Sequence, residues 1–384
     1  MDHKTLHQKS IEVIKQYQSE WGAYIASPNF ANYSYSWMRD GSYIAVAMDH
    51  AGQHKSSRQF HLWVNSVVKR YRHKINEIKI ALSQGKTLQD HNFLFTRYSL
   101  EGYEDLSDES WGNFQYDGYG SWLWALGEYY RLTQDKALVE EVWPSVIDVV
   151  NYLSLVWHLP SYDSWEEFPE LLHPYSLACV FGGFQTVQYL SEVCDLPADN
   201  QTVESDAQKI KAFVLRNAVC EGSLVKHIST NGGRKPPLDC CVDSNLLGVM
   251  VPNRLIEIDS AIGKRTLAGI HQDLVSPQGG VYRYQGDTYY GGGTWVLLTA
   301  WLGWAELEQG HYELAQARLD WIASKVDAQG WLPEQFTDEI LHDSMKQPWL
   351  DKWGPVAKPL LWSHAMYLIL HEALNQAKEG KHSG

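Results

Sequence analysis

The stretch VEEVWPSVIDVVNYLSLVW, residues 139–157, shows the periodicity that recurs through most of this chain. Its apolar side chains fall three and four positions apart, from Val139 and Val142 through to Val156. Residues with this spacing lie along one side of an α-helix. A helix of this kind is stable mainly when that side is buried against a neighbour, so the stretch predicts a packed helix.

The same spacing marks further segments, and turns rich in glycine and proline separate them. They are residues 10–27, 58–83, 120–133, 175–194, 204–219, 292–309, 312–326 and 358–377, with weaker candidates near 40–53, 243–250 and 255–270. We therefore expect an all-α protein of about a dozen helices, without alternating strands. No change of composition marks a domain boundary, so residues 1–384 are expected to form a single domain.

Two architectures suit such a series of helix pairs. A solenoid of stacked pairs should show a sequence repeat, and this chain shows none. The sequence therefore favours a closed double ring of helix hairpins, the six-hairpin toroid known as an (α/α)6 barrel.

The aromatic content of the chain is high. It holds 17 Trp, 22 Tyr and 10 Phe, which together make 13% of the residues. A buried indole needs a partner for its N–H group, and tryptophan therefore often lines pockets that bind flat ligands. Sugar rings, with apolar faces and polar rims, suit such walls. A large core that happens to use tryptophan explains the composition equally well.

Charge and targeting signals exclude several classes of function. The net charge of −14 argues against nucleic acid, which needs a basic surface. The N-terminal residues 1–18 lack the apolar segment of a secretion signal, and no apolar run reaches the length of a membrane span. The Cys count of 5 is odd, and Cys240 and Cys241 are adjacent. We therefore expect a cytoplasmic protein with reduced thiols.

Two loops near the N-terminus mix polar and aromatic residues. In YSYSWMRDGSY (33–43), Arg39 and Asp40 stand side by side before an expected helix. Such a pair can grip vicinal hydroxyl groups with paired hydrogen bonds, although a salt bridge at the helix start is the alternative. In SWGNFQYDGYGSW (110–122), Trp111 lies in a glycine-rich loop, and Asp117 could serve the site or cap a helix.

Two later loops carry glutamates beside tryptophan. DSWEEFPE (163–170) contains Glu166 and Glu167, and WLPEQFTDE (331–339) contains Glu334. Acid–base hydrolysis of a glycoside needs two carboxyl groups, one to protonate the departing oxygen and one to activate water. A solvated acidic surface is the alternative for either loop, and the spacing in sequence leaves their separation in space open.

Two further stretches join this set. VYRYQGDTYYGGGTW (281–295) is rich in glycine and tyrosine, and KPLLWSHAMY (358–367) carries His364 on an apolar helix. We interpret His364 as a core histidine with its hydrogen bonds satisfied. Residues 239–241 (DCC) with Asp243 lack the spacing of a zinc site, so no metal is expected.

Taken in order, these stretches resemble the glucoamylase family, glycoside hydrolase family 15. The resemblance runs from residue 33 to residue 367, through YSYSWMRD, SWGNFQYDG, SWEE, RYQGDTYYGGGTW, PEQF and PLLWSHA. It implies an (α/α)6 barrel without a cofactor. It also implies exo-acting hydrolysis of α-glucosides from the non-reducing end, with inversion at the anomeric carbon.

The resemblance assigns roles by position. Glu166 corresponds to the general acid, Glu334 to the general base, and Glu167 to a residue that contacts the substrate. Further substrate-binding positions are Trp37, Arg39, Asp40, Trp111, Arg283, Asp287 and Trp295. Glu170 matches nothing in the family pattern.

The chain also departs from the family pattern. The loop after Glu167 reads FPELLHPYS, and neither a β-sandwich domain nor a starch-binding domain is expected. A barrel-only cytoplasmic member suits short oligosaccharides, and we lean to α-1,6 linkages of the isomaltose type. Activity on α-1,4 linkages or on trehalose remains open, as does the oligomeric state.

Three other classes of protein fit part of the pattern. A disaccharide phosphorylase would lack a glutamate like Glu334, and a toroidal prenyltransferase would need metal. A non-catalytic sugar-binding protein would need neither Glu166 nor Glu334.

Overall fold

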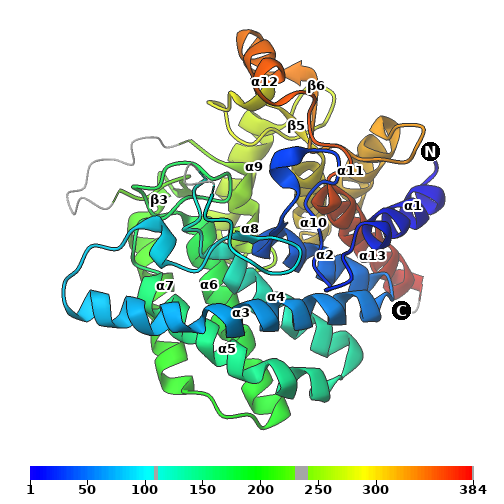
Figure 1. The fold of residues 1–384 in the computed structure, drawn as a ribbon. Helices are drawn as coiled ribbons and strands as arrows, with labels where there is room; N and C mark the ends of the chain where they lie inside the picture. The colour runs from blue at the N-terminus through cyan, green and yellow to red at the C-terminus, as the bar shows by residue number, and fades with distance from the viewer. Residues whose placement is uncertain (108–110, 230–240, 383–384) are drawn as a thin grey trace.

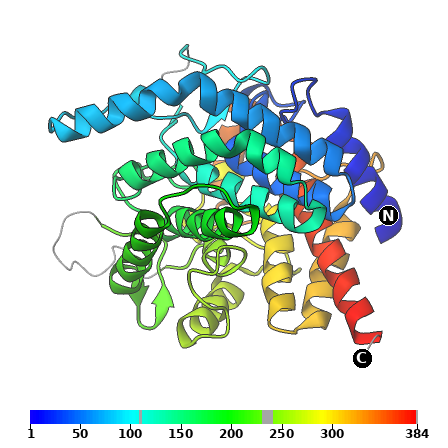
Figure 2. The same cartoon turned by 90° about the horizontal axis from the view of Figure 1, so that it is seen from below.

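The computed structural model describes residues 1–107, 111–229 and 241–382. The helices form two concentric rings (Figures 1 and 2). The inner ring consists of α2 (Met38–His50), α4 (Asp117–Thr133), α6 (Pro174–Cys194), α8 (Leu247–Met250), α10 (Val296–Glu308) and α13 (Leu361–His382). Each of these helices contacts the next one in this order, and α13 returns to contact α2, which closes the ring.

Two of the inner helices are enclosed along most of their length. Helix α2 is buried from Met38 to Asp49, and α10 is buried from Val296 to Gly303. A helix that is apolar all round belongs in the interior of a protein. The residues of α10 from Val296 to Gly303 are accordingly almost all apolar.

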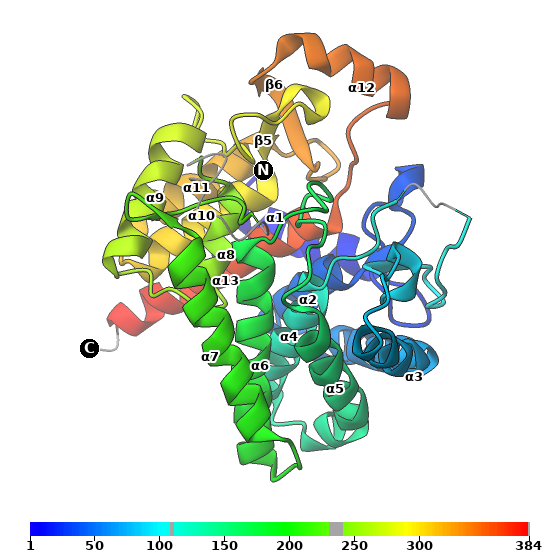
Figure 3. The same ribbon diagram turned by 90° about the vertical axis from the view of Figure 1, so that its left-hand side faces the viewer.

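The outer ring consists of the amphipathic helices. They are α1 (His3–Gln16), α3 (His54–Ser83), α5 (Lys136–Val156), α7 (Asn200–Asn217), α9 (Ala261–Leu274) and α11 (Tyr312–Lys325). The apolar side of α5, from Val139 and Val142 to Val156, is buried as the spacing predicts. Outer and inner helices alternate along the chain (Figure 3), so the predicted (α/α)6 barrel of about twelve helices is confirmed.

In the part of the chain that the structure describes, three short antiparallel sheets lie in the loops between helices. They pair β1 (Ser36–Trp37) with β2 (Arg97–Tyr98), β3 (Val219–Cys220) with β4 (Ser223–Leu224), and β5 (Gly293–Trp295) with β6 (Gln335–Ile340). Most of these strands are too short to show alternation in sequence. Strand β1 runs directly into α2, and β5 runs directly into α10. Trp37 and Trp295 therefore stand at the N-terminal ends of two inner helices.

The N-terminal helix differs from its prediction. The expected helix 10–27 is replaced by α1, which ends at Gln16. Asp2 caps its start by accepting a hydrogen bond from the Thr5 amide at 2.9 Å. Gly22 has a φ of 101°, and a Cβ atom there would lie 2.3 Å from the Gln59 carbonyl oxygen. The chain turns at this glycine because only glycine allows so close an approach.

Helix α12 (Lys346–Trp353) was not predicted. It contains Pro348 and spans only eight residues, and its apolar residues Trp349, Leu350 and Trp353 are only partly buried, so the segment is too short to show a repeating apolar pattern. Figure 1 shows α12 together with β6 at one end of the molecule, away from the double ring. None of the described helices is long and apolar enough to cross a membrane.

The cysteines depart from the expectation of reduced thiols. Cys220 is disulfide-bonded, whereas Cys179 and Cys194 are free and buried. Residues 239 and 240 of the DCC stretch lie outside the described residues.

Candidate active site

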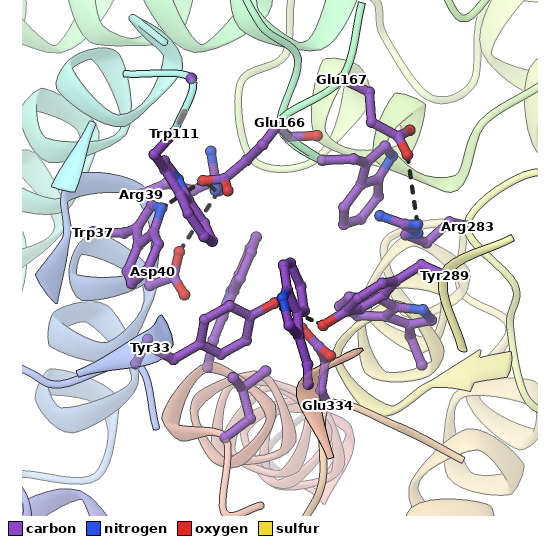
Figure 4. A pocket seen from close by; sticks show the side chains of 18 of the residues that line it. Tyr33, Trp37, Arg39, Asp40, Trp111, Glu166, Glu167, Arg283, Tyr289 and Glu334 are labelled. Carbon is purple, nitrogen blue, oxygen red and sulfur yellow. Dashed lines mark hydrogen bonds and ion pairs between the residues drawn. The ribbon is translucent and has the colours of Figure 1, made fainter. Parts of the chain in front are cut away.

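One pocket opens where the loops meet the N-terminal ends of the inner helices. It encloses about 430 Å³ and is lined by side chains from all four polar, aromatic loops (Figure 4). Of the residues assigned by resemblance, the lining includes Trp37, Arg39, Asp40, Trp111, Glu166, Glu167, Arg283, Trp295 and Glu334. Asp287 does not line the pocket. It is fully buried and accepts a hydrogen bond from Arg283 Nε at 2.7 Å, so it positions that guanidinium from behind.

Glu166 lies on one side of the pocket between two polar neighbours. Trp37 Nε1 donates a hydrogen bond to Glu166 Oε1 at 2.6 Å, and Arg39 Nη2 lies 3.9 Å from the same oxygen. The Glu166 backbone has a φ of 68°, in the left-handed region that non-glycine residues seldom adopt. The side chain is one-fifth exposed and faces the cavity.

The backbone around Glu166 is held by Asp163. One carboxylate oxygen of Asp163 accepts hydrogen bonds from the amides of Trp165 and Glu167, both at 2.9 Å. The Trp165 indole donates to both oxygens of Asp243 at 3.0 Å. These bonds fix both neighbours of Glu166, which lets the loop keep its left-handed conformation.

Arg39 and Asp40 project from the first turn of α2. Arg39 is buried, and its Nη1 donates to Asp117 Oδ2 and to Gln115 Oε1, each at 3.0 Å. Arg39 Nε lies 3.6 Å from Asp40 Oδ2. Burial raises the pKa of Asp40 to about 7, although the charge of Arg39 opposes the shift. Asp117 therefore serves as an anchor for Arg39 behind the pocket.

Glu334 lies on the opposite side of the pocket from Glu166 (Figure 4). Tyr33 Oη donates to Glu334 Oε1 at 2.9 Å, and Tyr289 Oη lies 3.1 Å from Tyr33 Oη. Glu334 Oε2 is buried and has no hydrogen-bond partner among the described residues. Burial raises the pKa of Glu334 to about 7, while the Tyr33 bond and the charge of Arg283 oppose the shift.

Glu167 points toward a separate group of polar side chains. Tyr284 Oη donates to Glu167 Oε2 at 2.5 Å, and Arg283 Nη2 lies 3.9 Å from Glu167 Oε1. The neighbouring wall is aromatic, with the rings of Trp165 and Trp295 5.6 Å apart. The two adjacent glutamates thus occupy different surroundings.

Sequence reasoning missed several lining residues. Tyr33 and Tyr289 lie inside stretches that were singled out, but nothing in their spacing distinguished them from other tyrosines. Trp349, Lys352 and Trp353 come from α12. The rings of Trp111 and Trp353 are stacked, 6.4 Å apart and 17° from parallel.

His364 is a core histidine, as interpreted from the sequence. It is fully buried, and its Nε2 accepts a hydrogen bond from the Leu332 amide at 3.1 Å. Its Nδ1 lies 2.9 Å from Ser10 Oγ. Burial lowers the pKa of His364 to about 3, so the ring is neutral and supports the segment that carries Glu334.

The family model for glycosyl hydrolases family 15 matches residues 2–349. The chain belongs to this family. It is a glycoside hydrolase. The chain is 37% identical over 371 residues to an isomaltose glucohydrolase of Kribbella flavida, covering 96% of this chain and 92% of that protein. It is 25% identical to trehalase 1 of Sulfolobus acidocaldarius, covering 75% of this chain and 49% of that enzyme.

Solved structures of glycosidases and glucoamylases share the architecture of this chain. A glycosidase variant in complex with glucose superimposes with a TM-score of 0.90 at 35% identity, covering 97% of both chains. A bacterial glucoamylase complexed with acarbose gives a TM-score of 0.74 at 19% identity, over 97% of this chain and 55% of that one. The second similarity is one of fold alone.

Proposed function

We propose that this family 15 member is an inverting, exo-acting α-glucoside hydrolase. It would release β-glucose from the non-reducing end of short α-gluco-oligosaccharides, with a preference for α-1,6 linkages. The observation that carries the proposal is the pairing of Glu166 with Glu334 across one aromatic-walled pocket. Among the described residues, the Glu334 carboxylate keeps one buried oxygen without a hydrogen-bond partner.

In this mechanism Glu334 is the general base. Tyr33 occupies Oε1, so Oε2 is the oxygen left to accept a proton from the attacking water. A carboxylate whose pKa is raised toward neutrality is a stronger base than an exposed one. The aromatic rings nearby exclude other water, which strengthens the interaction with the reacting molecule.

Glu166 is the general acid. Its proton passes to the glycosidic oxygen as the bond to the anomeric carbon breaks, while the water attacks from the other face of the ring. The Trp37 indole donates to Oε1, which leaves Oε2 of Glu166 to carry the proton. Inverting enzymes need about 6.5–9.5 Å between the two carboxyl groups to accommodate the water.

The remaining polar side chains would bind the terminal glucose. Arg39 is locked by Asp117 and can present its other nitrogens to sugar hydroxyls, with Asp40 beside it as an acceptor. On the other wall, Glu167 likewise provides a carboxylate acceptor and Arg283 a guanidinium donor. Trp37, Trp111 and Trp295 offer apolar faces to the ring.

The preference for α-1,6 linkages rests on the isomaltose glucohydrolase as a relative, at 37% identity over nearly the whole chain. The trehalase is a more distant relative, at 25% identity. Hydrolysis of α-1,4 linkages or of trehalose is the second candidate. A sugar-binding protein without activity would need neither Glu166 as an acid nor Glu334 as a base.

The test is glucose release from isomaltose, maltose, trehalose, kojibiose and nigerose, with the product anomer followed by early proton NMR. We expect isomaltose to be the best substrate and β-glucose to appear first. Release of α-glucose first would refute inversion. Absence of hydrolysis on all five sugars would refute the assignment as an exo-acting hydrolase of short α-glucosides.

Substitutions distinguish the roles of the two carboxyl groups. Glu166→Gln should lose most activity on disaccharides but keep much of it on aryl α-glucosides, whose leaving groups need no proton. Equal loss on both substrates would contradict the acid role. Glu170→Gln is the matched control, because Glu170 is an exposed glutamate from the same loop.

A further inference from the structure

Two histidines meet behind the loop that carries Glu166. Leu172 and Ile228 form an isolated antiparallel bridge, with mutual backbone hydrogen bonds of 3.0 and 2.8 Å. The next pair in that register is His173 with His227, and paired residues in antiparallel strands point to the same side. The two Nδ1 atoms lie 3.2 Å apart.

The hydrogen bonds of His173 identify which of its nitrogens carries a lone pair. His173 Nε2 lies 2.8 Å from the Ser161 carbonyl oxygen, which can only accept, so this nitrogen is the donor. In the neutral ring the lone pair is then on Nδ1 and faces His227. A histidine that donates one N–H group to a backbone carbonyl while aiming its other nitrogen at a common point is typical of metal ligands.

Asp163 supplies a third group at the same point. A carboxylate oxygen of Asp163 and one ring nitrogen from each histidine all lie within 4.8 Å of one another. The Oδ1 atom of Asp163 holds the loop, whereas Oδ2 is buried without a hydrogen-bond partner among the described residues. Asp163 and His173 are each 1% exposed. A buried carboxylate oxygen without a partner is costly and calls for a cation or a donor.

The charges around this cluster leave room for a further cation. The carboxylates of Asp163, Asp243 and Glu167 lie behind or beside the loop, and the neighbouring cations are Lys226 and Arg283. Lys226 Nζ lies 3.2 Å from Asp243 Oδ2 and 4.0 Å from Glu167 Oε2. Lys226 is thus paired mainly with Asp243, and Arg283 is paired mainly with Asp287.

We propose that Asp163, His173 and His227 bind one divalent metal ion of the Zn²⁺ type behind the acid loop. Two imidazole nitrogens and one carboxylate form a common ligand set for zinc, with water as the fourth ligand. Bonds of about 2.0 Å in a tetrahedron place ligand atoms about 3.3 Å apart, close to the separation of the two Nδ1 atoms. The ion would tie the loop at Asp163 to the start of α6 and to the segment at His227. It would thereby help position Glu166.

A second cluster of possible metal ligands has to be removed before metal binding at the proposed site can be measured. His7, His371 and Glu372 also place three ligand atoms within 4.8 Å of one another, between α1 and α13. Its residues are only partly buried. The experiment therefore starts from a His7→Ala variant of the full chain, stripped with a chelator.

The measurement is isothermal titration of this protein with Zn²⁺, together with the visible spectrum of its Co²⁺ form. We compare His227→Asn with the control His158→Asn, which alters an exposed histidine elsewhere. Asparagine can still donate a hydrogen bond but is a poor zinc ligand. The control should bind about one equivalent of metal, and His227→Asn should lose at least about 100-fold in affinity, together with the Co²⁺ absorption bands.

Thermal unfolding shows whether the variant is folded. Saturating Zn²⁺ should raise Tm by about 2 °C or more in the control and leave the Tm of His227→Asn unchanged. Equal affinities in the two variants, or no saturable binding in the control, would overturn the proposal and leave a hydrogen bond between two neutral histidines. Metal binding is measured without substrate, so failure of the proposed hydrolysis would leave this result unaffected.

Discussion

The loop that carries Glu166 and the segment that carries Glu334 hold their carboxyl groups in different ways. In the acid loop, Glu166 and Phe168 have positive φ values of 68° and 53°, and side-chain bonds to Asp163 maintain that shape. In the base segment, backbone bonds dominate. The Glu334 amide donates to the Ala357 carbonyl at 2.9 Å, and β6 begins at the next residue, Gln335.

Solvent exposure follows the same division. The Glu166 side chain is one-fifth exposed beside two donors, whereas Glu334 is 3% exposed. Burial raises the pKa of Glu334 more strongly than the Tyr33 hydrogen bond and the charge of Arg283 lower it, which suits a group that must accept a proton from water. A group that donates a proton to a leaving sugar needs contact with the pocket mouth instead. The general acid and the general base therefore need different surroundings in the fold. The five predictions below test this difference.

The largest effect is expected from Glu334→Gln. Loss of the base should lower kcat about 10³-fold or more on isomaltose and on aryl α-glucosides alike, because both reactions need an activated water. Steady-state rates on the two substrates provide the check. A variant that kept its activity on aryl glucosides would assign to Glu334 the behaviour expected of Glu166.

The support of the acid loop is tested by Asp163→Asn. The amide oxygen is a weaker acceptor than a carboxylate, so the left-handed backbone at Glu166 should become less well ordered. We expect a fall in kcat of about 10–100-fold on isomaltose and a much smaller fall on aryl glucosides. An equal fall on both substrates would show that Asp163 supports more of the pocket than the acid.

The pH profile addresses the base directly. Activity should decline as the pH falls below about 7, because protonated Glu334 cannot accept a proton. Tyr33→Phe removes a hydrogen bond that lowers the pKa of Glu334, so this acid-side decline should move to higher pH. The loss should be about 10-fold at pH 6 and smaller at pH 8, with the exposed Tyr103→Phe as control. An unmoved profile would contradict the role of Tyr33.

The stability of the protein in acid tests whether the buried core histidines are neutral. Burial lowers the pKa of His364 and of His61 to about 3, whereas both titrate near 6.5 in the unfolded chain. Between these values the unfolded state binds more protons, so stability is lost as the pH falls below about 6.5. Each group contributes a slope of about 1.4 kcal/mol per pH unit. Urea unfolding from pH 7 to pH 5 should show a shallower slope for His364→Gln.

The smallest effect is expected at the pocket mouth. Trp353→Ala removes a pocket-lining ring that is stacked against Trp111. We expect KM for isomaltose to rise about fivefold with little change in kcat, since stacking contributes about 1 kcal/mol. Trp21→Ala, which alters a half-exposed tryptophan far from the pocket lining, is the control. A fall in kcat alone would place Trp353 in the chemistry.

Prediction from sequence succeeded where a pattern is long and local. The outer helices follow from apolar stripes, as in α5, because a helix with one buried side must repeat every three to four residues. The prediction was wrong at 10–27, where one glycine approaches a distant backbone. It also missed α12, which buries none of its own residues.

For the candidate site as well, some features could be predicted from the sequence and others could not. The tryptophan-flanked glutamates and the Arg39–Asp40 pair could be named from composition, order and family resemblance. The sequence did not show that Asp287 supports Arg283 from behind, or that Tyr33 reaches Glu334. Residues 33 and 334 are far apart in the chain, and no local pattern records a contact between them.

By itself, the sequence determined the helical double ring and the loops in which polar groups interrupt the apolar pattern. Periodicity and residue type are properties of short segments, and the chain carries them wherever it folds. Only the tertiary structure decided which oxygen of Glu334 is left without a protein partner, and that Asp163 meets two histidines behind Glu166. Burial and hydrogen bonding depend on what other segments bring to the same place, and closing the ring is what brings them together.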